Sequence, residues 1–238
     1  MKRLFVWLKY FAKRILSSCP FLFYNLFKIL RYNDTRIVSK STELVIEGYP
    51  RSGNTYAIAA FQFSQSRTIN VASHVHMIIQ LKLGIKWNIP TIVIVREPID
   101  AIISFIIRED VSPRFAIFYY KNYYEYVKEI LSKIVVIRFS ELVNDFNILI
   151  KKVNQRYKTN YKGLVNTVEN NNEIFKVVKE MDKIDRGKKN VDSNTVAIPN
   201  DNRLKIKGKI EATLLNNPTY LNLINDCNKL FKEINSLL

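Results

Sequence analysis

The sequence contains few of the residues that build metal centres and disulfide frameworks. Its 238 residues include only two cysteines and two histidines. Cys19 and Cys227 are far apart, so their spacing predicts neither a disulfide framework nor a metal site. The simplest interpretation of this cysteine usage is a reduced, intracellular setting, and we therefore expect a cytoplasmic protein.

The N-terminal segment lacks acidic residues and a long uncharged run. The uncharged stretch 15–27 is shorter than the ~20 residues that a membrane-spanning helix requires. No small-residue cleavage site follows it, which argues against a signal peptide. We expect residues 1–36 to form a separate basic, hydrophobic helical segment. Residues 1–33 would either lie peripherally at the inner face of the membrane or pack as a helical hairpin on a domain formed by residues 37–238. The basic residues of this segment are Lys2, Arg3, Lys9, Lys13, Arg14, Lys28 and Arg31.

The overall composition is that of a globular protein with an anionic partner. Hydrophobic residues make up 47% of the chain and charged residues 24%, which is typical of a folded domain. The net charge of +16 favours binding to anions. No nucleic-acid-binding motif is present, so we do not predict a nucleic-acid partner.

Short apolar runs alternate with segments of helical periodicity. This alternation predicts an α/β fold with a central parallel sheet covered on both faces, a three-layer αβα arrangement. Beyond about residue 160 the pattern weakens, and residues 186–202 are polar and irregular, as in a loop. The predicted strands are 43–49, 68–73, 91–95 and 134–139, and the predicted helices are 54–65, 76–83, 98–107, 114–131, about 141–156, 171–183, 203–215 and 218–236.

A phosphate-binding loop is predicted between the first strand and the first helix. Gly48 and Gly53 have the spacing of such a loop, and Thr55 stands in its hydroxyl position. Backbone N–H groups and the helix N-terminus can cradle an anion there. The ATP-binding version needs a lysine directly before that hydroxyl, but the residue is Asn54, and the cation of the loop is Arg51. We predict a nucleotide other than Mg-ATP; a glycine-containing turn without a ligand is the alternative.

The segment 49–56 resembles the 5′-phosphosulfate loop of the PAPS-dependent sulfotransferases, where PAPS is 3′-phosphoadenosine 5′-phosphosulfate. That loop usually reads Pro-Lys/Arg-Ser-Gly-Thr/Asn-Thr followed by an aromatic residue. The resemblance implies a P-loop nucleotide-hydrolase-like fold, PAPS as co-substrate without a metal, and an acceptor with a free hydroxyl. Tyr56 would contact the base or pack inside, and Arg51 would also stabilise the departing phosphate. The implied cofactor-binding residues of the loop are Arg51, Ser52, Gly53, Asn54, Thr55 and Tyr56.

A second anion site is predicted where the strand 91–95 ends. Arg96 follows that strand, and ligands bind at the carboxyl ends of strands in α/β sheets. Ser104, on the following helix, could add a hydroxyl to the same anion. The residues alone favour the alternative of an Arg96–Asp100 salt bridge with Ser104 exposed. Arg-x-Pro with a serine eight residues after the arginine resembles the 3′-phosphate site of the sulfotransferases, and 136–142 resembles their later strand and helix start.

The proton acceptor is predicted at His74. Ala72-Ser73-His74 resembles the Lys-Thr-His segment of the sulfotransferases, whose histidine is the base in many members; here Ala72 replaces the lysine. A histidine has an ordinary pKa near 6.5, which suits proton transfer. Two alternatives remain at this stage. His74 and His76 could bind a metal from one face of a strand, although no Asp, Glu or Cys cluster supports this, or His74 could be structural.

Three functions are consistent with these motifs. The first is a sulfotransferase that moves a sulfuryl group from PAPS to a carbohydrate or lipid hydroxyl. The second is a divergent P-loop kinase or nucleotide hydrolase, and the third is a non-catalytic, membrane-associated nucleotide-binding protein. A late basic residue could close over the nucleotide, either Arg186, in the segment Arg-Gly-Lys-Lys, or Arg203. Tyrosines cluster between residues 119 and 126, where they would pack in the core or stack on a sugar acceptor.

Overall fold

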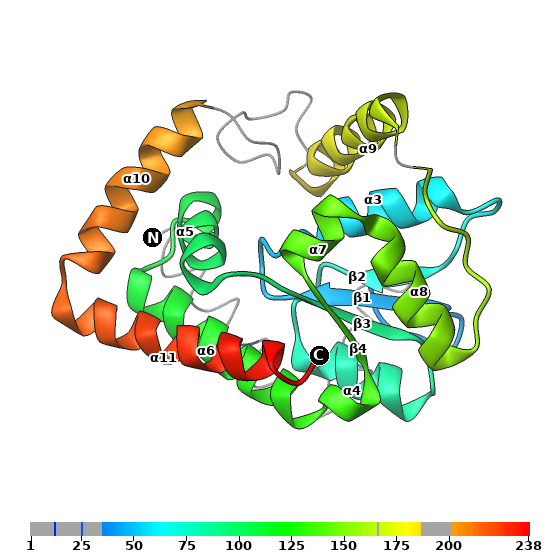
Figure 1. The fold of residues 1–238 in the computed structure, drawn as a ribbon, viewed down its shortest axis with the longest axis horizontal. Helices are drawn as coiled ribbons and strands as arrows, with labels where there is room; N and C mark the ends of the chain where they lie inside the picture. The colour runs from blue at the N-terminus through cyan, green and yellow to red at the C-terminus, as the bar shows by residue number, and fades with distance from the viewer. Residues whose placement is uncertain (1–11, 13–24, 26–34, 166, 187–200) are drawn as a thin grey trace.

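A computed structural model describes residues 12, 25, 35–165, 167–186 and 201–238 of the chain (Figure 1). Within these residues, four strands form one parallel sheet in the order β2-β1-β3-β4. Nearly all of their residues are buried, which accounts for their apolar sequences. The strands are β1 (Leu44–Gly48), β2 (Val71–Ser73), β3 (Thr91–Val95) and β4 (Val135–Arg138).

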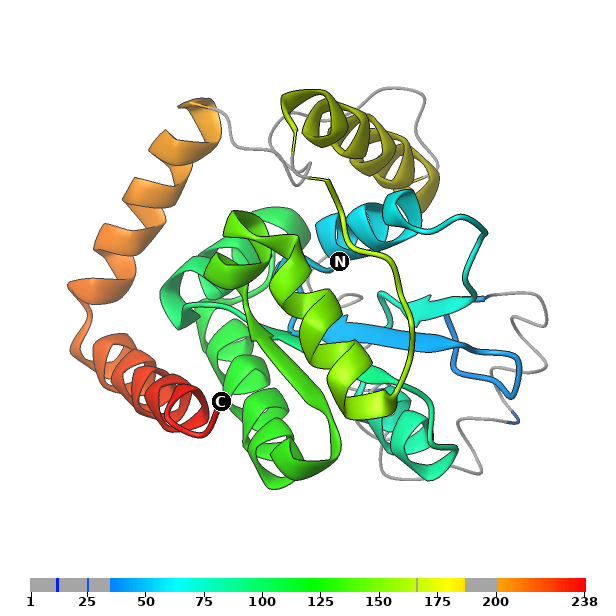
Figure 2. The same cartoon turned by 45° about the vertical axis from the view of Figure 1, so that its right-hand side comes forward.

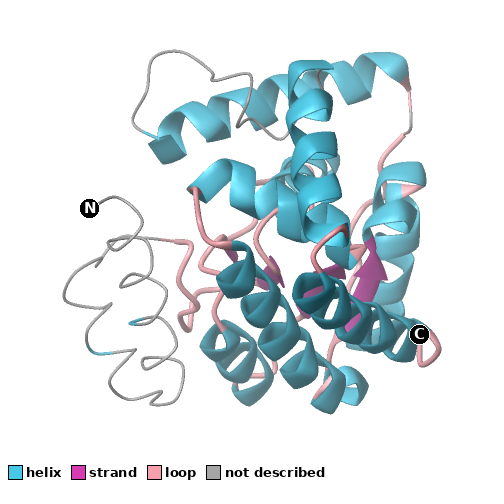
Figure 3. Ribbon diagram, turned by 90° about the vertical axis from the view of Figure 1, so that its left-hand side faces the viewer, coloured by secondary structure: helices cyan, strands magenta, loops and turns pink. Residues whose placement is uncertain are grey.

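Helices cover both faces of this sheet, as Figure 3 shows. Because strand side chains alternate between faces, Ile46 and Ile92 pack with α3, α8 and α9, whereas Val93 packs with α5, α6 and α11 and Val45 with α4. The prediction of a three-layer αβα fold is confirmed. The helices are α3 (Asn54–Ser64), α4 (Ile78–Lys86), α5 (Pro98–Glu109), α6 (Pro113–Glu129), α7 (Phe139–Asn144), α8 (Phe146–Tyr157), α9 (Val168–Arg186), α10 (Asp201–Leu215) and α11 (Pro218–Asn235), with a short 3-10 turn at Leu131–Lys133.

One predicted helix is wrong. The segment 141–156 was expected to be continuous, but the chain breaks at Asp145 into α7 and α8. Asp145 has extended backbone angles, φ −149° and ψ 99°, and its carboxylate accepts the N–H of Asn147 at 2.9 Å. An aspartate in this position caps the N-terminus of the next helix, so the local hydrogen bond replaces a continuous helical turn.

The C-terminal helices lie on two sides of the sheet. Figures 1 and 2 show α9 beside α3, whereas α10 and α11 lie beyond α5 and α6. The loop predicted at 186–202 falls mostly on residues 187–200, which lie outside the described residues, as does nearly all of the predicted N-terminal segment 1–36. In the part of the chain that is described, no helix combines the length and the apolar character needed to cross a membrane.

The strand order places β1 and β3 side by side at the centre of the sheet. The chain leaves β1 for α3 on one face and leaves the neighbouring β3 for α5 on the other. In α/β proteins, ligands bind at the carboxyl ends of the two strands where such a reversal occurs. The segments 48–55 and 96–104 both begin at these strand ends.

Candidate functional site

The loop between β1 and α3 depends on its two glycines. Gly53 precedes α3 with φ 99°, in the left-handed region that favours glycine. A Cβ atom on Gly53 would lie 2.8 Å from Cδ2 of Phe139, and one on Gly48 would lie 2.7 Å from the carbonyl oxygen of Ile94. Arg51 also has a positive φ, 71°, which is unusual for a residue with a side chain. The loop is therefore held in a tight, defined conformation at the N-terminus of α3.

Two of the predicted cofactor-binding residues turn their side chains inward. Ser52 is fully buried, and its hydroxyl lies 3.1 Å from the Tyr124 hydroxyl. Asn54 is 3% exposed, and its Nδ2 lies 3.4 Å from the carbonyl oxygen of Tyr49. Neither side chain is directed to an anion in the loop, and the backbone N–H of Ser52 donates to the carbonyl oxygen of Tyr49 at 3.1 Å. The side chain of Asn54, which stands where the ATP-binding loop has its lysine, is therefore directed into the protein.

Tyr124 supports the loop from beneath, a role that sequence reasoning missed. Its hydroxyl donates to the carbonyl oxygen of Ile94 at 2.8 Å and accepts the N–H of Tyr49 at 3.4 Å. Burial raises the pKa of this hydroxyl well above its ordinary value, although the bond to Ser52 acts in the opposite direction. Tyr124 thus joins α6, β3 and the loop. The tyrosine-rich sequence of α6 gave no signal that singled this residue out.

Arg51, Arg96 and Ser104 are linked by hydrogen bonds. Nη1 of Arg96 donates to the carbonyl oxygen of Arg51 at 2.9 Å, and Nε of Arg51 donates to the Ser104 hydroxyl at 3.2 Å. The structure therefore brings together the cation of the loop and both residues of the predicted second anion site. They come from the segments that follow β1 and β3 and from α5.

Arg96 is partly buried, and one of its donors lacks a partner among the described residues. Its guanidinium carbon lies 4.3 Å from the ring centroid of Phe139, and its Nε is a buried atom to which no described residue offers a hydrogen bond. Burial lowers the pKa of Arg96, while the charges of Asp100 and Glu97 act to raise it. A buried donor of this kind is costly unless a ligand or water accepts from it.

The alternative interpretation of the second site was an Arg96–Asp100 salt bridge. Asp100 instead pairs with Lys207 of α10, which sequence reasoning did not identify. Ser104 is 6% exposed, so it is a buried hydroxyl next to Arg51 and not an exposed one. The guanidinium of Arg96 is thereby left directed to the loop backbone and the Phe139 ring.

His74 meets the hydroxyl of the loop. It follows β2, and its Nε2 lies 3.0 Å from Oγ1 of Thr55, while its Nδ1 lies 3.1 Å from the Ser73 hydroxyl. The predicted proton acceptor and the predicted phosphate-binding hydroxyl are therefore adjacent, although they are 19 residues apart in sequence. The sheet achieves this because β2 lies beside β1.

His74 and His76 do not converge as a ligand pair would. Their rings are 6.1 Å apart and nearly perpendicular, and Nδ1 of His76 lies 2.9 Å from the carbonyl oxygen of Gly48. Over the described residues, no group of three or more His, Cys, Asp or Glu side chains is placed to hold a metal ion.

The remaining predicted positions lie apart from this group of residues or outside the described part of the chain. Tyr56 lies against Phe175 of α9, with ring centroids 6.0 Å apart, and burial raises its pKa. Three tyrosines of α6, Tyr120, Tyr123 and Tyr124, are buried in the core. The side chains of Arg186 and Arg203 lie outside the part of the chain that the structure describes.

Comparison with known proteins adds no family assignment. No model of a protein family matches the chain, and no curated protein matches it. What the fold and the site define is a three-layer αβα protein in which a glycine-containing loop, two partly buried arginines and a histidine lie together near the carboxyl ends of the central strands.

Proposed function

We propose that this protein is a PAPS-dependent sulfotransferase. The observation that carries the proposal is the hydrogen-bonded group of Arg51, Arg96 and Ser104 at the switch point of the sheet. It supplies two cations and a hydroxyl beside a loop of the phosphate-binding type. A nucleotide with a phosphate at each end of its ribose, as in PAPS, would satisfy both parts of the site.

The side chains fit such a ligand better than they fit Mg-ATP. The unpartnered Nε of Arg96 can donate to a phosphate oxygen, and a planar guanidinium binds a terminal phosphate through two parallel hydrogen bonds. Asn54 is neutral and its side chain faces inward, so this loop lacks the lysine that contacts the β- and γ-phosphates in ATP-binding loops. The loop N–H groups, Thr55 and Arg51 would hold the 5′-phosphate, and Arg96 with Ser104 would hold the 3′-phosphate.

The same arrangement supports group transfer. PAPS supplies the sulfuryl group, which passes to the oxygen of the acceptor hydroxyl. His74 would take the proton of that hydroxyl, since its Nε2 already faces the Thr55 hydroxyl at the phosphate loop. Arg51 and the loop N–H groups would stabilise the charge on the departing 5′-phosphate. We expect the acceptor to be a carbohydrate or a lipid.

A thermal-shift titration tests the choice of nucleotide. The full chain is titrated with 3′-phosphoadenosine 5′-phosphate (PAP), which lacks the sulfuryl group, and separately with Mg-ATP. At 100 times its Kd a ligand stabilises the folded state by about 2.7 kcal/mol, which raises Tm by about 5–10 °C for a chain of this size. Stabilisation by Mg-ATP alone would contradict the proposal and favour a P-loop kinase or hydrolase.

Transfer separates an enzyme from a binding protein. Labelled PAPS is incubated with carbohydrate and lipid acceptors, and the wild type is compared with His74→Ala. The variant should keep its stabilisation by PAP and lose transfer. Loss of both properties would contradict the role given to His74, and binding of PAP without transfer by the wild type to any acceptor would favour a non-catalytic nucleotide-binding protein.

A further inference from the structure

The turn that carries His74 has an unusual backbone. His74 and His76 have φ values of 60° and 54°, so two non-glycine residues on either side of Val75 lie in the left-handed region. Such conformations are unfavourable for residues with a side chain and persist only where the surroundings hold them. The turn next to His74 must therefore be held in this conformation by neighbouring groups.

Glu47 is the residue that holds this turn. It lies in β1 and is fully buried, an unusual position for a glutamate. One oxygen of its carboxylate accepts the N–H of Val75 at 3.0 Å, and the other accepts the N–H of His76 at 3.1 Å. The two bonds join the strand before the phosphate loop to the turn after β2.

Two further contacts fix the end of the turn. Nδ1 of His76 donates to the carbonyl oxygen of Gly48 at 2.9 Å and lies 3.6 Å from Oε2 of Glu47. The hydroxyl of Tyr119, on α6, donates to the carbonyl oxygen of His76. The turn is thus anchored to β1 and to α6.

The carboxylate also acts as a buried negative charge. Burial, and then the charge of Glu47, raise the pKa of both Tyr119 and Tyr123 on α6. The two backbone N–H groups and the His76 ring compensate this charge. A carboxylate can accept both N–H groups at once, whereas a glutamine offers one acceptor oxygen and an NH₂ group that would oppose the second N–H.

We propose that Glu47, acting through Val75 and His76, is a positioning residue that sets the location of the His74 ring at Thr55. This inference rests on the proposed function only for the role of His74 as proton acceptor. It does not follow from the phosphate-loop motif, since it depends on which neighbours β1 meets in the folded sheet.

Nuclear magnetic resonance of the imidazole rings tests the proposal without an acceptor. The sequence has only two histidines, so the full chain, labelled at histidine, gives two sets of ring signals that His74→Gln and His76→Gln assign. In the wild type, His76 should be protonated at Nδ1, because the Gly48 carbonyl can only accept. Glu47→Gln should shift or broaden the His74 signals as well as those of His76, and should lower the rate of sulfuryl transfer while PAP affinity is kept.

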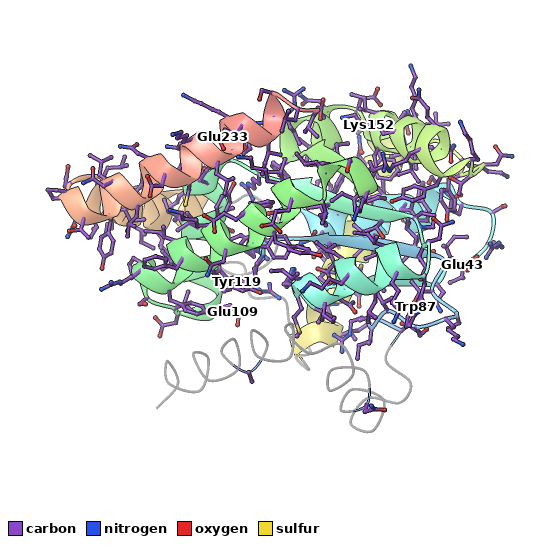
Figure 4. The ribbon with its side chains drawn as sticks, turned by 90° about the horizontal axis from the view of Figure 1, so that it is seen from below. Glu43, Trp87, Glu109, Tyr119, Lys152 and Glu233 are labelled. Carbon is purple, nitrogen blue, oxygen red and sulfur yellow. The ribbon has the colours of Figure 1, made fainter. Side chains whose placement is uncertain are left out.

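Glu43→Gln is the matched control. Glu43 directly precedes β1 and also accepts a backbone N–H, that of Asn70 at 3.0 Å, but it lies away from Tyr119 and the turn (Figure 4). This variant should leave both sets of signals unchanged. Circular dichroism checks that each variant is folded, and if Glu47→Gln is not, Tyr119→Phe removes a single anchor of the turn and should shift the His76 signals together with those of His74.

The inference would be overturned if the His74 signals were unchanged in folded Glu47→Gln, or in Tyr119→Phe if that variant is needed. A shift confined to the His76 signals would overturn it as well. The proposed function fails in a different way, because wild-type protein would then not bind PAP, whatever the histidine signals show. The two failures are therefore measured on different samples.

Discussion

Replacing Gly53 with alanine should destabilise the protein by several kcal/mol. An alanine held at φ 99° is in a left-handed conformation, which costs about 1–2 kcal/mol. Its Cβ would lie 2.8 Å from Cδ2 of Phe139, so the ring must move, and overpacking of this kind costs about 1–3 kcal/mol. Alanine also reduces the conformational freedom of the unfolded chain, which offsets about 0.4–1 kcal/mol of this destabilisation. We therefore expect a net loss of about 1–4.5 kcal/mol, a substantial part of the 5–15 kcal/mol that is typical of a domain.

Urea unfolding followed by circular dichroism measures this loss. Gly208→Ala is the matched control, because a Cβ built on this glycine in α10 meets no described atom within 4 Å other than those of its own helix backbone and chain neighbours. It should stabilise the protein by about 0.5–1 kcal/mol, since glycine in a helix is less favourable than alanine. Gly53→Ala should also weaken PAP binding, because the displaced Phe139 ring packs on Arg96. An unfolding free energy for Gly53→Ala within about 0.5 kcal/mol of the wild type would refute the reasoning.

Three further predictions follow from the site and its supports. Arg96→Ala should weaken PAP binding by about 100-fold or more, since two hydrogen bonds from a charged donor are lost at about 1.5–3 kcal/mol each, whereas Arg138→Ala, at the exposed end of β4, should leave the affinity measured by calorimetry unchanged. Tyr124→Phe should lower the unfolding free energy by about 1–3 kcal/mol, because the buried groups bonded to its hydroxyl lose their partner. Tyr123→Phe should be neutral or stabilising, because the Tyr123 hydroxyl has no hydrogen-bond partner among the described residues, and equal urea midpoints for the two variants would contradict this. Hydrogen bonds from the side chain of Arg67 and then from the backbone N–H of Asn70 lower the pKa of Glu43 below its ordinary value of 4.5. The ionised Glu43 therefore adds a small amount to the free energy of unfolding at pH values above 4.5, and this contribution is lost as the pH falls through the lowered pKa. The difference in unfolding free energy between wild type and Glu43→Gln should therefore shrink on acidification from about pH 7 to about pH 3, and a difference that grows would show the opposite linkage.

The sheet was predictable because its strands have clear sequence patterns. The run 91–95 is apolar and β-branched, and its predicted bounds are those of β3. The break at Asp145 was missed because an aspartate within an apolar periodicity does not reveal whether it faces solvent or caps a new helix. The strand 68–73 proved shorter, since only Val71–Ser73 meets β1.

The site was predictable in part. That Arg96 lies near the loop between β1 and α3 follows from the rule that parallel strands end at one edge of the sheet. The bond of Arg51 to Ser104 and the contact of His74 with Thr55 depend on side-chain directions that sequence spacing does not determine. Tyr124 and Glu47 were missed because periodicity identifies a buried residue without showing which polar group it meets.

Calorimetric titration of the full chain with PAP and with adenosine 5′-phosphate, both in the presence of EDTA, tests the central claim most directly. The two ligands differ only in the 3′-phosphate, so the comparison isolates the contribution of Arg96 and Ser104. We predict that PAP binds without a metal and about tenfold or more tightly than adenosine 5′-phosphate, which corresponds to about 1.4 kcal/mol or more. Equal affinities for the two nucleotides, or binding of PAP only after Mg²⁺ is added, would contradict the account.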